Sequence, residues 1–577
     1  MSRRIAIVGA GQSGLQLALG LLGEGYAVTL VSNQTAEQVR GGWVQSSQCM
    51  FASALTTERA LGLDFWSREC PPIEGIAFTA AAASGGRASE WAARLDSPAQ
   101  SVDQRLKLSR WLEEYERRGG RLVIQEASVG DLERLTREHE LVVVATGRGG
   151  LGGIFPRDEA KSPYRSPQRA LALTYVRGME PRADYPAVSF NAIPGVGEYF
   201  VFPALTLGGP CEIMVFEGIP GGPMDCWDDV HTPAEHLTRS LKILQRLIPW
   251  EYARCRRVEL TDERGILTGR FTPVVHEPVG VLGSGAAVLA MADAAVLNDP
   301  LTGQGSNNAA KCAEIYLERV LGRGGEAFDA EWMRQTFDYY WRSYARWVVA
   351  WTNAMLAPPP AHVLRLLSAA QELPSLASTI AAGFDDPRTL HPWWFDAEAA
   401  DRLIAERRAE QARGLDLREL RAALGQFATG VTVITARDQG GRPVGVTANS
   451  FTSLSLEPPL VLWCLGRRAM SLPAFRSCGW FGVNVLASHQ HHLSRLFATS
   501  GADKFTGTDV KEGPSGVPLL EGALAHFVCR NVRQIEAGDH VIMIGEVEHY
   551  ETHDGEPLVF HSGSYRVTTR HPELESG

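Results

Sequence analysis

Three glycines near the start of the chain have the spacing of a dinucleotide site. Gly9, Gly11 and Gly14 form the pattern G-x-G-x-x-G directly after the apolar run 5–8, which predicts a buried parallel strand turning into a helix. In that setting the first glycine permits a tight turn, the second lets the backbone approach a pyrophosphate, and the third lets helix and strand pack closely. Free N–H groups at the helix N-terminus then favour an anion. The pattern therefore favours dinucleotide binding over a plain glycine-rich turn.

A second stretch, 297–308 (LNDPLTGQGSNN), has the composition of a loop that faces a cofactor. Gly303, Gln304 and Gly305 stand just before a predicted helix over 306–321. Backbone N–H groups at such a position can face the negatively charged edge of a reduced flavin. The alternative is an ordinary loop that caps a helix, and the pairing with the N-terminal glycines favours the cofactor interpretation.

The elements that must position these residues follow along the chain. Residues 27–31 predict a second strand, which closes a β-α-β unit. Ser32 and Asn33 then stand where an acidic residue usually binds the ribose hydroxyl, which predicts weak anchoring and suits a flavin that binds and leaves. The next predicted elements are a helix over 102–112 and strands over 121–126 and 140–146.

The rest of the chain divides into three predicted regions. Residues 165–275 have the short strands and Gly/Pro turns of a sheet-based substrate domain. Residues 326–414 are helical in pattern and end in a charged amphipathic helix over 396–413, which has the character of a connector. From 417 onward, short strands separated by turns predict a small antiparallel barrel. Since no second G-x-G-x-x-G occurs there, a nucleotide bound to the barrel needs a different scaffold.

Composition excludes several classes of protein. With 577 residues, the chain is long enough for about three or four structural units. A net charge of −10 predicts no binding of nucleic acid or of an anionic membrane. No apolar run is long enough to span a bilayer, and Met1 is followed by a strand rather than a signal segment.

Cysteine and histidine usage predicts neither a disulfide framework nor a metal site. The nine cysteines never form C-x-x-C, which also excludes the redox-active pair of a flavin disulfide reductase and indicates a reducing cytoplasm. His489, His491 and His492 have no carboxylate or cysteine partner at ligand spacing, so they predict a solvated turn.

Six motifs in the first 395 residues carry a family resemblance. They are IVGAGQSGL, SVDQRL, VVVATGRGGLG, SPQRALAL, ADAAVLNDPLTGQGSNN and RWVVAWTNAML. With them, residues 1–395 resemble the FAD-dependent epoxidase component of two-component styrene and indole monooxygenases, within the wider group of aromatic hydroxylases. Single-component aromatic hydroxylases carry an Asp-Gly pair that helps present NAD(P)H, and residues 150–170 have none. The resemblance thus implies that this part does not reduce its own flavin.

The last third of the chain carries a second set of motifs. Residues 415–577 contain FATGVTVITA, VGVTANSFTSLSLEPPLVL, FGVNVLA, DKFTG and GDHVIMIGEV. They resemble the small NADH:flavin oxidoreductases that serve such oxygenases, so the whole chain resembles a natural fusion of oxygenase and reductase. The fold implied is α/β, with a Rossmann-like FAD-binding fold of the aromatic-hydroxylase type, an inserted sheet-based substrate domain, and then a split β-barrel. The domains expected are 1–395, a helical linker 396–414, and 415–577.

The resemblance also assigns roles to individual residues. FAD contacts in the first module are Gly9, Gly11, Gly14, Arg105, Asp293, Pro300, Gly303, Gln304 and Gly305, and Ala292 replaces the glycine usual before Asp293. Flavin contacts in the second module are Thr447, Ala448, Asn449, Ser450, Ser453, Lys504 and Phe505, with His540 on the nicotinamide side. Substrate contacts are Ser46, Gln48, Met50, Ile73, Ile76 and Leu301. The first five of these resemble the indole-oxidising branch more than the styrene-degrading branch, with Gln48 suited to an indole N–H. Each alone is more often plain core than a ligand contact, and the set together favours the indole-type interpretation.

Together these resemblances imply a self-sufficient oxygenase. NADH would reduce FAD in residues 415–577, and reduced FAD would react with O2 in residues 1–395 to form a C4a-hydroperoxide that epoxidises indole or a styrene-type substrate. Because the cofactor carries the chemistry, no catalytic side chain is nominated. A homodimer formed through the barrel is also implied. The alternative is a flavin reductase fused to a flavin carrier, which would yield only hydrogen peroxide in air.

Overall fold

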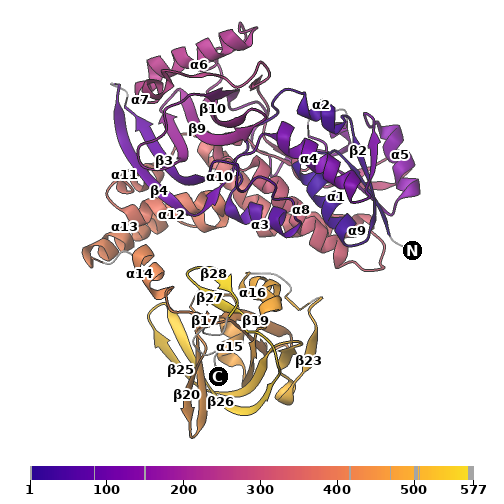
Figure 1. The fold of residues 1–577 in the computed structure, drawn as a ribbon, viewed down its shortest axis with the longest axis vertical. Helices are drawn as coiled ribbons and strands as arrows, with labels where there is room; N and C mark the ends of the chain where they lie inside the picture. Colours follow the sequence, from indigo (N-terminus) through magenta and orange to yellow (C-terminus); the bar gives the residue numbers. More distant parts are fainter. Residues whose placement is uncertain are drawn as a thin grey trace, which may run out of the picture. The chain divides into compact units, whose positions relative to one another are not determined.

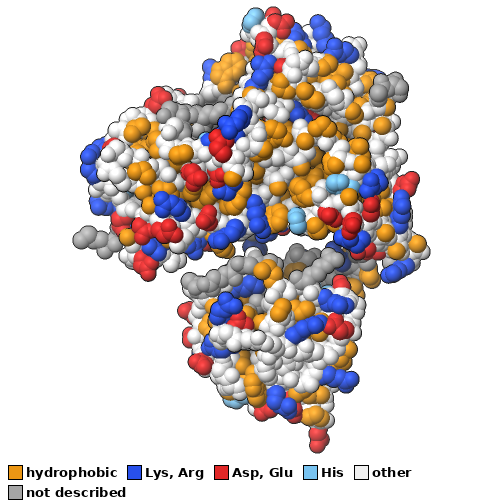
Figure 2. All heavy atoms as spheres, turned by 180° about the vertical axis from the view of Figure 1, so that it is seen from behind, with side chains coloured by type: hydrophobic (Ala, Val, Ile, Leu, Met, Phe, Trp, Pro, Cys, Tyr) orange, Lys and Arg blue, Asp and Glu red, His pale blue; other side chains and the backbone are white. Residues whose placement is uncertain are grey.

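The computed structural model describes residues 3–82, 85–147, 151–414, 417–467, 469–499, 504–505 and 507–568. The chain divides into two compact units, 1–414 and 415–577, called unit 1 and unit 2 (Figure 1). Both units combine helices and strands, so the chain is of the mixed α/β type. Within the described residues, no helix is long and apolar enough to cross a membrane. Acidic and basic side chains are interspersed over the face shown in Figure 2.

The first sheet of unit 1 has the strand order β14-β15-β6-β1-β2-β5. Five of these strands run parallel, and β14 lies antiparallel to β15 at one edge. The strands predicted at 27–31, 121–126 and 140–146 are present as β2, β5 and β6. Ile5–Val8 of β1 is buried throughout, as expected for a parallel strand covered on both faces. The bounds are β1 Arg4–Val8, β2 Ala27–Ser32, β5 Arg121–Ile124, β6 Leu141–Val144, β14 Val279–Val281 and β15 Ala287–Ala290.

Helices from distant parts of the chain flank this sheet. The helices predicted at 102–112 and 306–321 are α4 and α8. The α1 and α8 helices pack against each other, and Gln16 Nε2 donates to Ala310 O over 3.1 Å. This packing brings the loop that precedes α8 to the glycine turn that precedes α1. The bounds are α1 Gln12–Gly23, α4 Gln104–Arg117, α5 Val129–Glu138 and α8 Gly305–Leu321.

The second sheet of unit 1 has the order β11-β7-β10-β9-β8-β3-β4, with β12 also paired to β7. Neighbouring strands are antiparallel except β3 and β8. Strands β7 to β12 come from the predicted range 165–275, whereas β3 and β4 lie outside it. The β3–β8 pairing joins segments far apart in the sequence, which local patterns do not record. The bounds are β3 Ile73–Ala81, β4 Arg87–Ala99, β7 Ala170–Arg177, β8 Ala187–Ile193, β9 Gly197–Thr206, β10 Gly209–Gly218, β11 Glu259–Leu260 and β12 Ile266–Gly269.

Different helices cover the two faces of this second sheet (Figure 1). Met214 and Phe216 point toward the core that includes α6, whereas Ile213 and Val215 point toward a core built with helices α10 to α13. The alternation follows from the two-residue period of a strand. The bounds are α6 Pro233–Leu247, α7 Pro249–Tyr252, α9 Ala330–Tyr340, α10 Arg346–Leu356, α11 Ala361–Ala369 and α12 Pro374–Asp385.

The helix predicted as a connector, α13 (Ala397–Ala412), is part of unit 1. It packs against α11, and Leu403 and Ile404 are buried in the same core as Trp351. Unit 1 therefore extends as a compact body to residue 414. The remaining short elements of unit 1 include α2 Ala36–Arg40, α3 Ala52–Ala60, β13 Val274–Val275 and β16 Val296–Leu297.

Unit 2 is built on an antiparallel sheet with the order β19-β18-β22-β25-β26-β21-β20. Its core includes Trp463, whose ring lies edge-on to Phe475 and Phe481. The helices are α14 Leu417–Leu424, α15 Leu472–Ser477 and α16 His491–Ala498. The large sheet comprises β18 Thr432–Arg437, β19 Pro443–Ala448, β20 Thr452–Leu456, β21 Pro459–Gly466, β22 Trp480–Val485, β25 Ala525–Ala537 and β26 His540–Thr552. Smaller sheets are formed by β17 Thr429–Gly430, β27 Val559–His561 and β28 Ser564–Arg566, and by β23 Val510–Glu512 and β24 Pro518–Leu520.

A buried amide ties three segments of unit 2 together. Asn484 on β22 is fully buried, and its Nδ2 donates to Val433 O over 2.9 Å and to Thr435 Oγ1 over 3.1 Å. Its Oδ1 accepts from Leu520 N at 2.8 Å, at the end of β24. The side chain thus satisfies buried groups on either side of its own strand.

Replacement of Asn484 by alanine should destabilise unit 2 by about 3 kcal/mol, because it leaves the buried Leu520 N–H without an acceptor and opens a small cavity. Denaturant unfolding followed by tryptophan fluorescence measures the change. Ser477→Ala, at an exposed position on α15, is the control and should change stability by less than about 0.5 kcal/mol. Equal stability of the two variants would contradict this role for Asn484.

Candidate functional site

Each of the three glycines of the first turn stands at its position for a different structural reason. Gly9 has φ +117°, and a Cβ there would lie 2.6 Å from Ala145 C. A Cβ on Gly14 would lie 1.9 Å from Gly9 O, so this glycine allows α1 to touch the strand end. Gly11 is the N-cap of α1, and a Cβ there would meet nothing within 4 Å. Gly9 and Gly14 are therefore needed for packing, and Gly11 keeps space open.

That open space is part of a cavity of about 430 Å³ in unit 1. One side is formed by the start of α1, a second by the loop before α8, and a third by an apolar face of the second sheet. The sheet side consists of Leu171, Leu173, Val215, Leu267 and Phe271, and its polar neighbours include Gln45, Ser47, Gln104, Thr268 and Asn298. A mostly apolar pocket with a few polar groups is the usual form of a small-molecule site.

The cavity brings together part of the predicted set. Gly11, Ser46, Asp293, Pro300, Gly303 and Gly305 line it. Of the rest, Gly9 and Gly14 hold the turn, Ile73, Ile76 and Leu301 lie in the core, and Met50 packs beside Ala310. Gln304 is fully buried, and its Nε2 donates to Phe384 O over 2.7 Å. Gln48 is also buried, with its Oε1 accepting from Ser46 Oγ at 3.0 Å.

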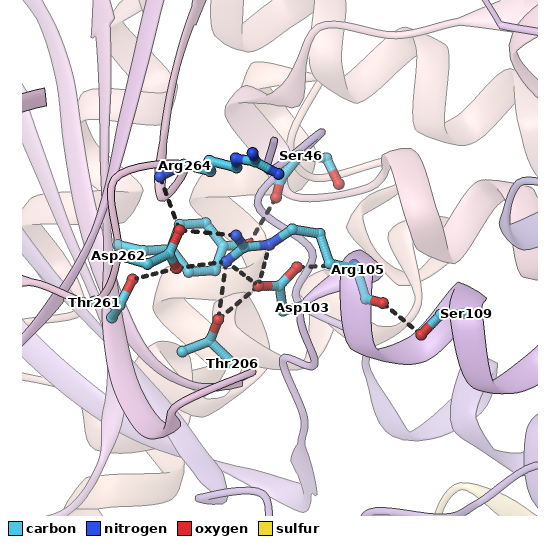
Figure 3. Close-up of polar contacts among 9 residues, drawn as sticks. Ser46, Asp103, Arg105, Ser109, Thr206, Thr261, Asp262 and Arg264 are labelled. Carbon is cyan, nitrogen blue, oxygen red and sulfur yellow. Dashed lines mark hydrogen bonds and ion pairs between the residues drawn. The ribbon is translucent and has the colours of Figure 1, made fainter. Parts of the chain in front are cut away.

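Arg105, predicted to contact FAD, is enclosed by carboxylates (Figure 3). Its side chain is 2% exposed. It donates to Asp103 Oδ2 over 2.7 and 3.0 Å, to both oxygens of Asp262 over 2.9 Å, and to Thr206 Oγ1 over 3.2 Å. Burial lowers the pKa of this guanidinium, but its hydrogen bonds to Asp262 and Asp103 outweigh burial and raise it. Arg105 therefore links α4 to the loop between β11 and β12, and its positive charge is balanced by the carboxylates of Asp103 and Asp262.

The neighbouring Gln104 lines the cavity in place of Arg105. Both residues belong to the motif SVDQRL, which spans the start of α4. Asp103 is the N-cap of α4 and accepts from Arg105 N at 2.9 Å, which fixes the first turn. Gln45, Ser47 and Thr268 lie in none of the sequence motifs, and Thr268 reaches the cavity through the pairing of β12 with β7. Asn298 belongs to the stretch 297–308, where the sequence assigns it no role.

Asp293 reaches the cavity from a short turn after β15. This turn, Ala292–Ala294, begins at Ala292 with φ +49°. That left-handed conformation suits glycine, which explains why a glycine is usual there in the family that the sequence resembles. A Cβ on Gly147, after β6, would lie 3.8 Å from Asp293 Oδ2, so the carboxylate lies beside the end of the central strands.

In unit 2, the predicted contacts fall into two groups. Thr447 and Lys504 both bind carbonyls of α16: Thr447 Oγ1 donates to Ser494 O over 2.6 Å, and Lys504 Nζ donates to Phe497 O over 2.9 Å. Burial lowers the pKa of Lys504. Phe505 packs edge-on to Phe497 with ring centroids 5.2 Å apart. These residues gather where α16 meets β19.

The second group lies along β21. Ser450 Oγ accepts from Cys464 N at 2.9 Å, and His540 pairs with Gly466, two residues further along. The His540 side chain is 49% exposed, and its Nδ1 lies 2.8 Å from Asp539 Oδ1. Ala448 is buried at the end of β19, whereas Asn449 and Ser453 are exposed.

No metal was predicted, and among the described residues one group has suitable geometry for a metal. The ligand atoms of His526, Glu551 and His553 lie within 4.8 Å of one another. Lys511 already donates to Glu551 Oε1, and His526 Nδ1 lies 2.7 Å from the same oxygen. Glu551 is thus already engaged by Lys511, and the group is distinct from His489, His491 and His492, which the sequence predicts to be no metal site.

Comparison with known proteins shows what each of the two units is similar to. Residues 147–254 match the family described as "Styrene monooxygenase A putative substrate binding domain", and residues 424–569 match "Flavin reductase like domain". The "Styrene monooxygenase StyA" of Pseudomonas fluorescens is 28% identical over 385 residues, which are 65% of this chain and 91% of that protein.

The carboxyl-terminal match is stronger in identity. The "FMN reductase (NADH) SmoA" of Agrobacterium fabrum is 43% identical over 152 residues, which are 26% of this chain and 86% of that protein. Through unit 2, the chain belongs to the flavin reductase family. Unit 2 is thus the reductase domain, and unit 1 is the monooxygenase-like unit. The fusion that the sequence motifs predict is confirmed.

The relatives differ in how much of them is matched. A "Probable flavin reductase" of Rhizobium meliloti (strain 1021) is 45% identical over 154 residues, which are 27% of this chain and 50% of that protein. The chain therefore spans about half the length of this relative, and most of the length of the other two.

The cavity of the monooxygenase-like unit fits the FAD that the resemblance implies. Its Gly11 leaves room for a pyrophosphate, and no side chain caps the N-terminus of α1, so backbone N–H groups are available to an anion. Ser32 Oγ donates to Gln34 O over 2.6 Å, so the position usual for a ribose-binding carboxylate holds a hydroxyl engaged in its own loop. The residues present thus suit a flavin that is held at its phosphates and only weakly at its ribose.

The two glycines should respond differently to alanine. Gly14→Ala should destabilise the monooxygenase-like unit by about 3 kcal/mol, because a Cβ 1.9 Å from Gly9 O forces α1 away from β1. Gly11→Ala should leave the melting temperature unchanged and weaken flavin binding roughly tenfold, about 1.4 kcal/mol, because its Cβ occupies the phosphate space.

Thermal unfolding and equilibrium binding of FAD measure the two effects. Gly23→Ala serves as the control, because a Cβ at this end of α1 also meets nothing within 4 Å, yet the residue does not line the cavity. If Gly11→Ala and Gly23→Ala bind FAD equally well, the phosphate assignment is wrong.

Proposed function

We propose that this protein is a self-sufficient flavin-dependent monooxygenase. The reductase domain oxidises NADH and reduces FAD, and the monooxygenase-like unit uses the reduced FAD and O2 to epoxidise a small aromatic substrate, with indole favoured over styrene. The observation that carries the proposal is the presence, in one chain, of a reductase domain and of a unit whose phosphate-compatible glycine turn opens onto an apolar cavity.

The first sheet and its helices would serve as a Rossmann-like FAD-binding fold of the aromatic-hydroxylase type. The N-terminus of α1 would bind the pyrophosphate, Asp293 would hold the ribityl or pyrophosphate region, and the segment from Pro300 to Gly305 would lie along the ring. Reduced FAD, when bound, supplies the electrons that activate O2 for transfer of one oxygen atom. The chain itself contributes orientation and a dry site.

The apolar side of the cavity would hold the aromatic substrate. Leu171, Leu173 and Val215 come from adjacent strands of the second sheet and present a continuous apolar surface. Such a surface binds an aromatic hydrocarbon and excludes the water that would waste the activated oxygen. The arrangement calls for no side-chain nucleophile.

The reductase domain would bind flavin as a split β-barrel. Thr447 near the end of β19 and Asn449 and Ser450 just after it would offer short hydroxyl and amide groups to the flavin phosphates, and His540 would contact the nicotinamide. Large exposed apolar residues of this domain, among them Phe427 (78% exposed), Leu456 (92%) and Met470 (75%), favour a homodimer formed through it.

His540→Ala should separate the two activities. NADH oxidation should fall at least about tenfold, because the variant removes a polar contact to the nicotinamide, whereas epoxidation driven by externally reduced FAD should be retained. His549→Ala, which removes an exposed histidine of the same strand β26, is the control and should retain both activities. NADH consumption and product formation are measured in parallel in air.

Two outcomes would overturn the division of labour. Loss of both activities in His540→Ala would mean that the two units do not work separately. Hydrogen peroxide as the sole product from externally reduced FAD, with indole and styrene both present, would favour the alternative of a reductase joined to a flavin carrier.

Gln48 should decide the preference for indole. Its Oε1 accepts from the Oγ of Ser46, a residue that lines the cavity, and this amide oxygen has a second lone pair that can accept an indole N–H. Gln48→Leu should lower the ratio of kcat/KM for indole over styrene by about tenfold, because only indole has an N–H to lose. Met214→Leu, a buried apolar exchange on the face of β10 opposite the cavity-lining Val215, should leave the ratio unchanged. An unchanged ratio in Gln48→Leu would show that the Gln48 amide does not bind the indole N–H.

A further inference from the structure

Two buried carboxyls lie directly behind the wall of the cavity. Glu217 on β10 points to the same face as Val215, two residues before it, and pairs across the sheet with Leu171. Both of those neighbours line the cavity. Asp299 stands between Asn298 and Pro300, which also line it. The two carboxyls therefore join the second sheet to the segment 297–305 that precedes α8.

The two carboxyls are both shielded from water. Glu217 is 0% exposed and Asp299 is 1% exposed. Neither oxygen of Glu217 accepts a hydrogen bond from a donor among the described residues, and Asp299 is the neighbouring carboxyl that acts on it. Two ionised carboxylates in this setting would repel each other, so one member of the pair must carry a proton. Asp299 Oδ1 also accepts from Leu301 N at 3.1 Å, which ties the pair to the turn Pro300–Thr302.

The charges around the pair favour a held proton. Arg169 is buried nearby, but its guanidinium already donates to both oxygens of Glu198 over 2.7 and 2.9 Å. Glu198 stands directly across from Glu217 on β9, so it adds a negative charge to the same face. Tyr164 is the other titratable neighbour, and its hydroxyl donates to Asn353 O over 2.9 Å.

Burial accordingly raises the pKa of Glu217 well above its usual range, and the facing Asp299 raises it further. Burial also raises the pKa of Asp299. Because folding raises these values, the folded chain holds the proton more tightly than the unfolded chain does. The pair therefore stabilises the fold most at low pH, and this stabilisation is lost as pH rises through the raised value.

We propose that Glu217 and Asp299 share one proton and act as a positioning pair that holds the segment 297–305 against the second sheet. With the proton present, a hydrogen bond joins the two elements. When the proton leaves, two negative charges face each other in a dry site and push the segment away from the sheet. Only the consequence for oxygenation rests on the proposed function, since the lock itself belongs to the cofactor-free chain.

The first experiment detects the proton on the cofactor-free full-length chain. Infrared difference spectra between neutral and high pH should show the C=O band of a buried protonated carboxylic acid in the wild type, and this band should be absent in Glu217→Gln and in Asp299→Asn. Glu212→Gln is the matched control, because Glu212 lies on the same strand, faces the opposite side of the sheet, and has a pKa that burial raises to about 7. Wild-type spectra without a band that depends on both Glu217 and Asp299 would overturn the shared proton.

The second experiment follows the segment itself. Hydrogen–deuterium exchange of peptides covering 297–305, corrected for the intrinsic pH dependence of exchange, should lose about tenfold protection at high pH in the wild type and in Glu212→Gln, because the hydrogen bond that holds the segment is lost with the proton. In Glu217→Gln the amide donates to Asp299 without a titrating proton, so protection should not change with pH. The same loss of protection in Glu217→Gln as in the wild type would overturn the positioning role.

A third measurement connects the lock to oxygenation. With externally reduced FAD, kcat/KM for the aromatic substrate should fall with rising pH in the wild type and stay flat in Glu217→Gln. A chain that shows the infrared band and the exchange change but forms no oxygenated product would contradict the proposed function and leave the positioning pair established. Parallel pH profiles in both proteins would contradict the effect of the pair on the reaction.

Discussion

The cavity depends on the close contact between α1 and the ends of strands β1 and β6. A side chain at Gly14 would collide with Gly9 O, and one at Gly9 would collide with the backbone of Ala145. Only glycines allow this approach, and the approach places the free N–H groups of α1 at the mouth of the cavity. Since α8 packs on α1, the same contact also places the segment 297–305. A shift of α1 would therefore displace two sides of the site together.

Buried polar groups connect the second sheet to the rest of unit 1 at two places. Arg105 joins α4 to the loop between β11 and β12 through Asp103 and Asp262, and Glu217 joins β10 to Asp299. Burying charged groups rarely adds net stability, because their desolvation costs about as much as their attraction returns. Such groups instead favour one arrangement of the two sheets, because each hydrogen bond forms only in that arrangement. The cavity is thus defined by polar contacts at its edges and by apolar packing across its floor.

The weak ribose position fits the division of the chain into two units. Ser32 Oγ is engaged by Gln34 O, so the end of β2 has no carboxylate to bind a ribose. A flavin held chiefly by its phosphates and ring can exchange between a reductase and an oxygenase. In the proposed function, covalent fusion raises the local concentration of each unit for the other. The chain supplies binding and access, and the cofactor supplies the chemistry.

Local patterns in the sequence determined the elements and much of the site. The strand before Gly9, the helix after Gly305 and the strands of the reductase domain follow from hydrophobic period and glycine spacing, which act over a few residues. The glycine spacing pointed to Gly11, Gly303 and Gly305, and the family resemblance pointed to Asp293 and Pro300; all five line the cavity. The motifs also identified the fusion that the comparisons confirm.

Only the tertiary structure decided which side each residue faces and which distant residues meet. Arg105 turns to Asp262, 157 positions away, and leaves Gln104 to line the cavity. The β3 and β4 strands join a sheet built mainly from later residues, and Glu217 meets Asp299 across two elements with no shared motif. Such pairings depend on how whole sheets and helices pack, and each residue's local pattern is the same whether or not its partner is present. The sequence by itself therefore determined the helices and strands and the chemical groups that they carry. Tertiary packing determined which of these groups are neighbours.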